Sequence, residues 1–206
     1  MKPGFSALRL ISASLSGVLL SGCLLKTATV PPHHFVLAPI PTSESSPKHF
    51  PFEIGLVKMP AYVLRDSIAV RNGANEIEYL ENALWAERLD QSFQRTLAAD
   101  MYRSRSATNQ SAESESKWQR LRLLVTVDQF DVDTAGRGTL VAQWRIAASD
   151  GSESVTSGYA RLVRTGGSPR GNSAAIAQTM SELTADFGSE LTRLLSGSAK
   201  TAAVSP

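Results

Sequence analysis

The fold class is inferred first from the sequence Leu121-Arg122-Leu123-Leu124-Val125-Thr126-Val127. Every second residue is leucine or valine, which is the period of a strand with one buried face. Residues 140–146 and 155–163 continue the pattern, and turn-forming residues at 133–136 and 149–152 separate the three stretches. Three neighbouring strands joined by short turns predict an antiparallel meander.

Segments on both sides of this meander have the period of an amphipathic helix. The first is expected to run from a cap at Asn82 to about Tyr102, and its apolar residues recur in steps of four: Trp85, Leu89, Phe93, Leu97 and Met101. The last helix carries its own apolar stripe: Ile176, Met180, Leu183, Phe187, Leu191 and Leu194. Small polar residues, including Ser181 and Thr184, are expected on its other face.

Ahead of the first helix, the sequence predicts a strand at 53–58 and a hairpin formed by short strands at 68–71 and 75–79. Alternation in the first of these strands puts Ile54 and Leu56 on the same face. The predicted order is therefore β-β-β-α-β-β-β-α. Two helices with one apolar stripe each are most simply buried on one face of a mainly antiparallel sheet, which is a two-layer α+β fold.

Residues 1–22 have the pattern of a secretory signal, because Lys2 and Arg9 flank the start of an apolar run that ends at Leu20. The run holds about a dozen residues, whereas a helix needs ~20 to span a bilayer. Cys23 is the only cysteine, so it cannot form an internal disulfide. The sequence Leu20-Ser21-Gly22-Cys23 resembles the lipobox of bacterial lipoproteins, at which the thiol is diacylated and the chain is cut. Lipidation of Cys23 is therefore predicted, with a plain secreted protein as the alternative.

Removal of the signal would change the charge balance. The whole chain has 21 Lys and Arg against 19 Asp and Glu, a net charge of +2. Residues 1–22 hold two of the cations and no acid, so the mature chain would carry 19 charges of each sign. This balance gives no basis for a nucleic-acid partner, and none is predicted.

Residues 23–51 are predicted to form a tether between the lipid and a single globular domain at 52–196, with a disordered tail at 197–206. Six prolines argue against regular structure in the tether: Pro31, Pro32, Pro39, Pro41, Pro47 and Pro51. One β-like piece, His34-Phe35-Val36-Leu37, is expected to pair with an edge of the sheet. If the whole tether were loose, its ~28 residues would reach ~100 Å when taut.

The predicted domain lacks the residue types of most enzymes. All three histidines fall within residues 33–49, so histidine-based triads and imidazole metal sites are not expected in the domain. Asp128, Asp131 and Asp133 do not match a calcium loop, because the twelfth position counted from Asp131 is Ala142. The sequence therefore predicts no catalytic residue, no metal and no cofactor.

The stretch from Gly55 to Leu89 holds four short motifs in a specific order: Met59-Pro60-Ala61-Tyr62, Leu64-Arg65-Asp66, Ile68-Ala69-Val70-Arg71 and Trp85-Ala86-Glu87-Arg88. This order resembles the family of ABC-type transport auxiliary lipoproteins (PqiC/YmbA-like). Phe130-Asp131 and Trp144 fit the paired strands of the same family. The resemblance covers roughly residues 30 to 195.

The resemblance implies a non-catalytic periplasmic lipoprotein at the outer-membrane end of an MCE-type intermembrane lipid transport system. It implies that the lipoprotein docks or caps the MCE-domain protein of that system, and it leaves open a ring of identical subunits. Leu24 follows the lipidated cysteine, and a residue other than aspartate there is consistent with sorting to the outer membrane. Three alternatives stay open: an assembly or regulatory lipoprotein for a cell-wall synthase or secretion pore, a carrier with a lipid cavity between helices and sheet, and an enzyme.

Six residues are the candidate partner or structural motif: Pro60, Tyr62, Arg65, Arg71, Trp85 and Glu87. Pro60, Tyr62 and Trp85 would form either a core corner or a partner surface, because Tyr, Trp and Arg are enriched at interface hot spots. Arg65 and Arg71 are expected to pair with Glu87 and so to fix the first helix to the strands. Loss of Arg71 or Glu87 is expected to lower stability rather than to remove a catalytic step.

Overall fold

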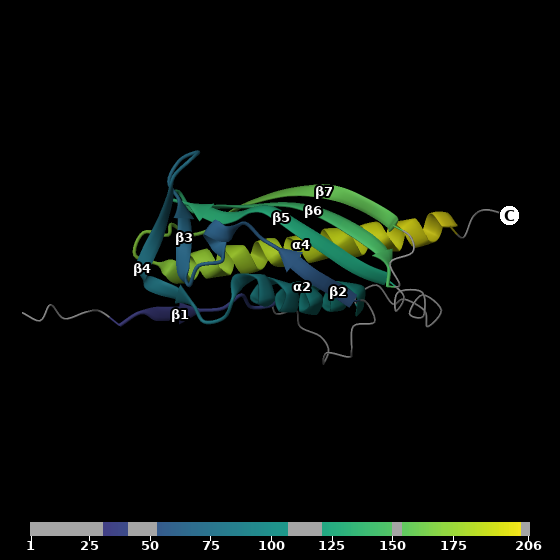
Figure 1. Ribbon diagram of the computed structural model, residues 1–206, viewed down its shortest axis with the longest axis horizontal. Coiled ribbons are helices and arrows are strands. Elements are labelled where there is room, and N and C mark those ends of the chain that lie inside the picture. The colour runs from purple at the N-terminus through teal and green to yellow at the C-terminus, as the bar shows by residue number, and fades with distance from the viewer. Residues whose placement is uncertain (1–30, 41–52, 107–120, 150–153, 203–206) are drawn as a thin grey trace, which may run out of the picture. The chain divides into compact units, whose positions relative to one another are not determined.

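The computed structural model describes residues 31–40, 53–106, 121–149 and 154–202 (Figure 1). The chain divides into two compact units at Pro31–Pro32, and the architecture below is that of the second unit. The predicted signal and Cys23 lie outside the described residues. Among the helices that are described, none is both long and apolar enough to cross a membrane.

Seven strands of the described chain form one mixed sheet in the order β1-β4-β3-β5-β6-β7, and β2 pairs with β5 beside β3. Their bounds are β1 (His33–Phe35), β2 (Glu53–Lys58), β3 (Ser67–Arg71), β4 (Ile77–Trp85), β5 (Leu121–Asp133), β6 (Arg137–Ala148) and β7 (Ser154–Thr165). The antiparallel β5-β6-β7 meander and the β3-β4 hairpin are confirmed, and β1 is the predicted edge strand.

The prediction of a mainly antiparallel sheet is wrong, because the β1–β4, β2–β5 and β3–β5 pairs are all parallel. Each of these parallel pairs joins strands that do not follow one another in the chain, and only a short turn between consecutive strands requires antiparallel pairing.

Helices α2 (Leu89–Ser106) and α4 (Ser173–Ala202) cover one face of the sheet, as predicted (Figure 1). Helix α2 begins at Leu89 and not after Asn82, so the expected start is wrong. Residues up to Trp85 continue β4 instead, because Phe35 of β1 pairs with Trp85 and supplies the strand with a partner.

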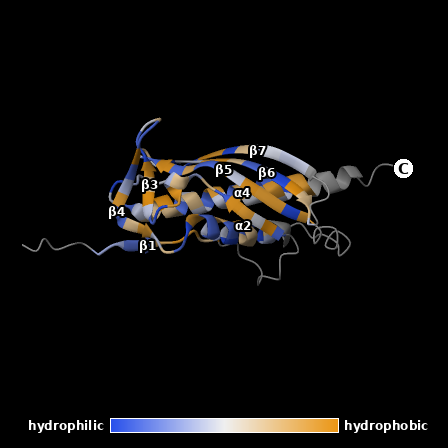
Figure 2. Ribbon diagram, in the orientation of Figure 1, coloured by the Kyte–Doolittle hydropathy of each residue, from blue (hydrophilic) through white to orange (hydrophobic). Residues whose placement is uncertain are grey.

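The core lies between this helical layer and the sheet, and Figure 2 shows hydrophobic residues running along β3, β5 and β6. Phe93 of α2 stands edge-on to Phe130 of β5, with ring centroids 5.3 Å apart. The same ring lies 6.3 Å from Phe187 of α4. At the rim, Arg164 of β7 binds Glu182 and Asp186 of α4 at 2.6 and 2.5 Å. Aromatic contacts and ion pairs therefore join helices and strands directly.

Helix α4 differs from its prediction in two respects. Ser181 and Thr184, expected at the solvent face, are 4% and 0% exposed. Their hydroxyls donate to carbonyls four residues earlier, and their small size allows close packing on that side. The helix also continues to Ala202 where disorder was expected from residue 197, since each added helical residue gains a hydrogen bond at little cost.

Strand β2 contains a bulge that reverses the direction of one side chain. Ile54 pairs with Leu123 and Val57 with Val125, so β2 takes one more residue than β5 between these points. Ile54 and Val57 are therefore both buried, whereas Leu56 is 72% exposed, contrary to the expectation that it shares a face with Ile54.

Residues 33–40, which we call the strap, lie across the two helices. The side chain of Leu37 is 0% exposed. The Leu37 N–H donates to Ser92 Oγ of α2 at 3.2 Å, and the Ala38 N–H donates to Ser181 Oγ of α4 at 3.1 Å. This part of the predicted tether is therefore packed onto the domain, because buried hydroxyls and an apolar side chain hold it there.

Adjacent strap residues provide a matched test of this packing. We expect Leu37→Ala to lower the free energy of unfolding by ~2–5 kcal/mol, because it removes a fully buried side chain and leaves a cavity. Val36 is 45% exposed, so Val36→Ala should change stability by no more than ~0.5 kcal/mol. Urea unfolding of both variants measures the difference, and equal stabilities would show that the strap does not belong to the folded domain.

Candidate functional site

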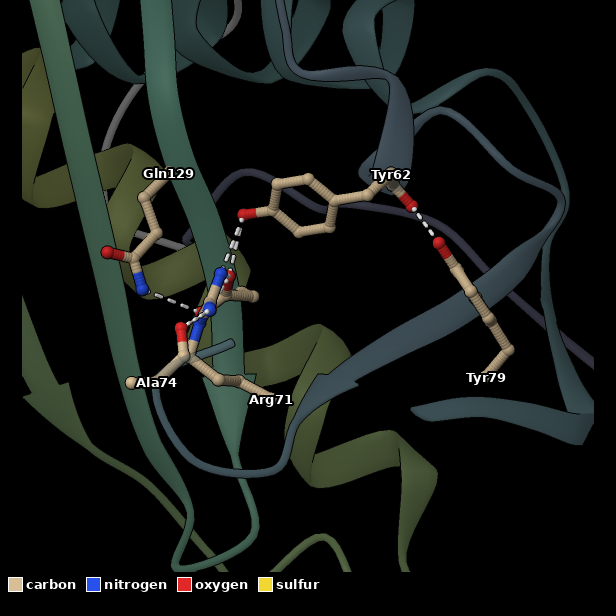
Figure 3. Close-up of polar contacts among 6 residues, drawn as sticks. Tyr62, Arg71, Ala74, Tyr79 and Gln129 are labelled. Carbon is tan, nitrogen blue, oxygen red and sulfur yellow. Dashed lines mark hydrogen bonds and ion pairs between the residues drawn. The ribbon is translucent and has the colours of Figure 1, made fainter. Parts of the chain in front are cut away.

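A cluster of polar side chains surrounds Asp131 on β5 (Figure 3). Arg71 approaches its carboxylate side-on, with Nε at 3.1 and 3.0 Å from the two oxygens and Nη2 at 2.6 Å from Oδ2. The Tyr62 hydroxyl donates to Oδ2 at 2.6 Å, and Gln129 Nε2 donates to Oδ1 at 2.9 Å. We call these four residues the carboxylate lock.

The lock joins two neighbouring elements of the chain to β5, which lies about 60 residues further on. Tyr62 lies on the short 3-10 helix η2 (Ala61–Val63), which Pro60 begins in an extended conformation. Arg71 ends β3, whose parallel register against β5 brings the two strands together. The Tyr79 hydroxyl of β4 donates to the Tyr62 carbonyl at 3.2 Å, so the fourth strand of the chain is also tied to η2.

Burial sets the electrostatics of the lock. The Asp131 side chain is 2% exposed and the Arg71 side chain 22% exposed. Burial raises the pKa of Tyr62 to about 12, and the neighbouring Asp131 carboxylate adds to the effect. The hydrogen bonds to Asp131 raise the pKa of Arg71 further above its ordinary value. Near neutral pH, Tyr62 therefore stays a donor and Arg71 a cation, an arrangement suited to holding structure and not to exchanging protons.

The structure brings together Tyr62 and Arg71 of the six predicted residues but separates the others. Trp85 is 7% exposed in the core, and Pro60 is half-buried at the start of η2. Arg65 places its guanidinium 4.6 Å from the centre of the Tyr79 ring. Trp85 therefore lies in the core, whereas Pro60 and Tyr62 are half-buried.

The predicted pairing of Arg65 or Arg71 with Glu87 is wrong. Glu87 instead accepts from Arg95 Nη2 and, at 2.8 Å, from Ser92 Oγ on α2. The Arg95 hydrogen bond lowers the pKa of Glu87. Arg71 is unavailable to Glu87 because Asp131 already holds it. The sequence did contain a signal for this, since Asp131 stands between Phe130 and Val132 within a strand, where a buried carboxylate requires a partner.

A second polar cluster lies where α2 meets the strap. Ser92, Thr96 and Asp100 are spaced four residues apart on α2 and are 0%, 0% and 4% exposed. Thr96 Oγ1 donates to the Leu37 carbonyl at 3.2 Å, and the Ile40 N–H donates to Asp100 Oδ1 at 3.2 Å. Sequence analysis missed this row, because polar residues beside an apolar helical stripe are typical of a solvated face.

Asp100 is the least well satisfied member of the row. Its Oδ2 is buried without a hydrogen-bond partner within the described part of the chain. Arg103 Nη1 is 3.5 Å from Oδ1 and donates to the Ile40 carbonyl at 3.0 Å. Burial raises the pKa of Asp100 from 3.8 to about 6, against the smaller opposing effects of the Ile40 N–H and Arg103. Its ionisation therefore costs the folded state free energy at neutral pH.

Comparison with known proteins now identifies the family. The model of the ABC-type transport auxiliary lipoprotein component family matches residues 35–191. The chain belongs to this family. The match begins inside the strap and ends in α4, so the family's domain includes residues 35–40 of the strap. None of the curated proteins matches this auxiliary lipoprotein.

Two solved structures share the fold of the auxiliary lipoprotein. A crystal structure described only as that of an uncharacterized protein is 14% identical, covers 81% of this chain and 99% of its own, and gives a TM-score of 0.62. A Xanthomonas campestris protein of the DUF330 family is also 14% identical and covers 82% of this chain and 98% of its own, with a TM-score of 0.56. At this identity the likeness concerns the fold alone.

The carboxylate lock and the Glu87 pair should contribute very differently to stability. We expect Arg71→Ala to lower the free energy of unfolding by ~3–5 kcal/mol, because it leaves the buried Asp131 carboxylate without its cation. Glu87→Ala breaks a partly exposed ion pair and should cost no more than ~1 kcal/mol. Urea unfolding of the two variants tests this order, and a loss for Glu87→Ala as large as for Arg71→Ala would contradict it.

Asp100 should produce a pH dependence of its own. Its pKa is higher in the folded than in the unfolded state, so its contribution to stability falls as the pH rises from about 4 to about 6. In Asp100→Asn this decline should disappear, and the unfolding free energy between pH 4 and pH 7 should drop less steeply than in the parent. Asp90 is the control, since Arg88 lowers its pKa and Asp90→Asn should change the slope in the opposite sense. Parallel profiles for parent and Asp100→Asn would refute the assignment.

Proposed function

We propose that this chain is a non-catalytic subunit of an MCE-type intermembrane lipid transport system. Lipid on Cys23 anchors it to the periplasmic face of the outer membrane, where its domain docks or caps the MCE-domain protein. The observation that carries the proposal is the match of residues 35–191 to a family of lipoprotein components of ABC-type transport. The sequence Leu20-Ser21-Gly22-Cys23 supports the anchor, because it provides the thiol and the small residues at which such chains are lipidated and cut.

The docked strap supports a short link between membrane and domain. Only the nine residues 24–32 separate Cys23 from the first residue of β1. Fully extended, they reach ~30 Å, a third of the distance available if the whole tether were loose. Each methylene of the acyl chains that enters the bilayer contributes ~0.8 kcal/mol to anchorage. The domain is therefore held within ~30 Å of the membrane. The end of a partner that bridges two membranes would lie in this layer.

The chemistry of the carboxylate lock supports a non-catalytic role. The oxygens of Asp131 accept from Arg71, Tyr62 and Gln129. Tyr62, with a pKa of about 12, is a poor base near neutral pH. The polar side chains around Asp131 are thus hydrogen-bonded to one another, and a substrate would have to break these hydrogen bonds in order to bind there.

The anchor is tested by replacing the cysteine. In the parent, mass spectrometry of the mature protein should find acyl chains on Cys23, and the protein should sediment with the outer membrane on a density gradient. Cys23→Ser should lose both the acyl mass and the membrane association, because serine supplies no thiol for the thioether. The same variant should bind the purified MCE-domain protein as the parent domain does, since the docking surface lies on the folded domain.

Two results would overturn the proposed function. One is a native protein without acyl chains. The other is a domain that binds no MCE-domain protein in either form, or that turns over a substrate by itself.

A further inference from the structure

The sheet face opposite the helices contains a groove of about 750 Å³ that is lined by residues of β2, β5, β6 and β7. In Figure 1 β5, β6 and β7 lie side by side, and β2 pairs with β5. The groove borders the core at Val125 and Trp144, and it is separate from the carboxylate lock, whose residues do not line it. Its walls carry Leu56, Leu124 and Tyr159 together with Lys58 and Arg145.

Strand register explains why these side chains meet. Leu124 of β5 pairs with Arg145 of β6, and Gln143 of β6 pairs with Tyr159 of β7, so these residues point to the same face. The β2 bulge adds Leu56 to that face. A Cβ at Gly55 would lie 2.8 Å from a methyl carbon of Leu124, so a larger residue there would require that side chain to shift.

The apolar members of the groove are exposed to an extent unusual for their size. Leu56 is 72% exposed and Tyr159 60% exposed. A single exposed leucine needs no explanation, but an exposed leucine and tyrosine that share one concave surface form the kind of patch that marks an interaction site. Tyrosine in such a position is also a frequent interface hot spot.

The charged members of the groove carry one sign. Lys58 and Arg145 are both exposed, and no carboxylate is among the lining residues. Within the described chain, neither of them takes part in a salt bridge. Two other arginines of the sheet are paired, since Arg122 binds Glu53 at 2.9 Å and Arg164 binds two acids of α4. The cations of the groove are therefore free to meet carboxylates from another molecule.

We propose that this groove docks a protein segment in which an aliphatic or aromatic side chain is flanked by carboxylates. The segment belongs to the partner that the auxiliary lipoprotein serves, so the inference rests on the proposed function and specifies its docking surface. Polar residues in the wall, among them Thr126 and Gln143, and the open rim fit a peptide better than an acyl chain. An acyl chain would favour an enclosed apolar cavity.

The inference is tested on the full lipoprotein in cells and with purified partner. A photo-reactive phenylalanine analogue replaces Leu56 or Tyr159, and Val36 on the strap is the control position because it is exposed but far from the groove in the fold. The expected crosslinks join positions 56 and 159, but not 36, to the MCE-domain protein. Mass spectrometry should map them to a segment with carboxylates beside an apolar residue.

Affinity measurements give the second readout. We expect Leu56→Ser to weaken binding of the purified MCE-domain protein about tenfold or more, as at an interface hot spot. Arg145→Glu should weaken binding and reduce its dependence on salt, because it removes an attraction and adds a repulsion. Arg193→Glu is the matched charge reversal on the exposed surface of α4 and should leave the affinity unchanged. Thermal melts should match the parent, since all three residues are exposed.

The possible results distinguish a failure of the groove proposal from a failure of the proposed function. If the MCE-domain protein binds all variants equally and crosslinks only from position 36, the groove is overturned while the proposed function stands. If the parent binds no MCE-domain protein, the proposed function fails. In that case, crosslinks from 56 and 159 to an acid-flanked segment of another identified envelope protein still support the groove. Crosslinks only to lipid, only to a second copy of this chain, or to nothing overturn it.

Discussion

Burial of two apolar helical stripes on a single face of the sheet is the constraint on which the rest of the structure depends. Phe93, Phe130 and Phe187 meet at its centre and bring α2, β5 and α4 into contact. Because both helices take the same face, no helix of the described residues covers the opposite face. The side chains on this opposite face are therefore exposed to solvent unless another molecule covers them.

Two buried carboxylates, Asp131 and Asp100, differ in how completely their hydrogen bonds are satisfied. At the carboxylate lock, Asp131 is surrounded by donors and a cation, which offsets the cost of its burial. At the strap, Asp100 has one buried oxygen without a hydrogen bond and a pKa near 6. The strands are therefore held by a satisfied network, whereas the strap is held by contacts that include an unfavourable charge.

Hydrophobic period alone predicted the meander, both helical stripes and the two-layer fold, because each of these depends on burial along one element. It failed where contact with a distant segment of the same chain determines the local structure. Trp85 lies in step with the helical stripe, yet β1 pairs with it and keeps it in a strand. Leu56 lies in step with Ile54, yet a bulge against β5 turns it outward. Ser92, Thr96 and Asp100 resemble a solvated face until the strap covers them.

The same distinction applies to the site. The candidate motif included Tyr62 and Arg71, whereas Asp131 matched the family only as part of a strand. Their contact depends on the register of β3 against β5, which the sequence did not predict. The strap and the groove lie on opposite sides of the domain. The strap lies on the helices and shortens the link to Cys23, so the helical side of the domain is already occupied by its own chain. In the docking that we propose, a partner covers the uncovered sheet face. There the β2 bulge places Leu56 beside Lys58 and Arg145, which form no salt bridge within the described residues. A domain organised in this way separates attachment from recognition, so that either can change without disturbing the core between them.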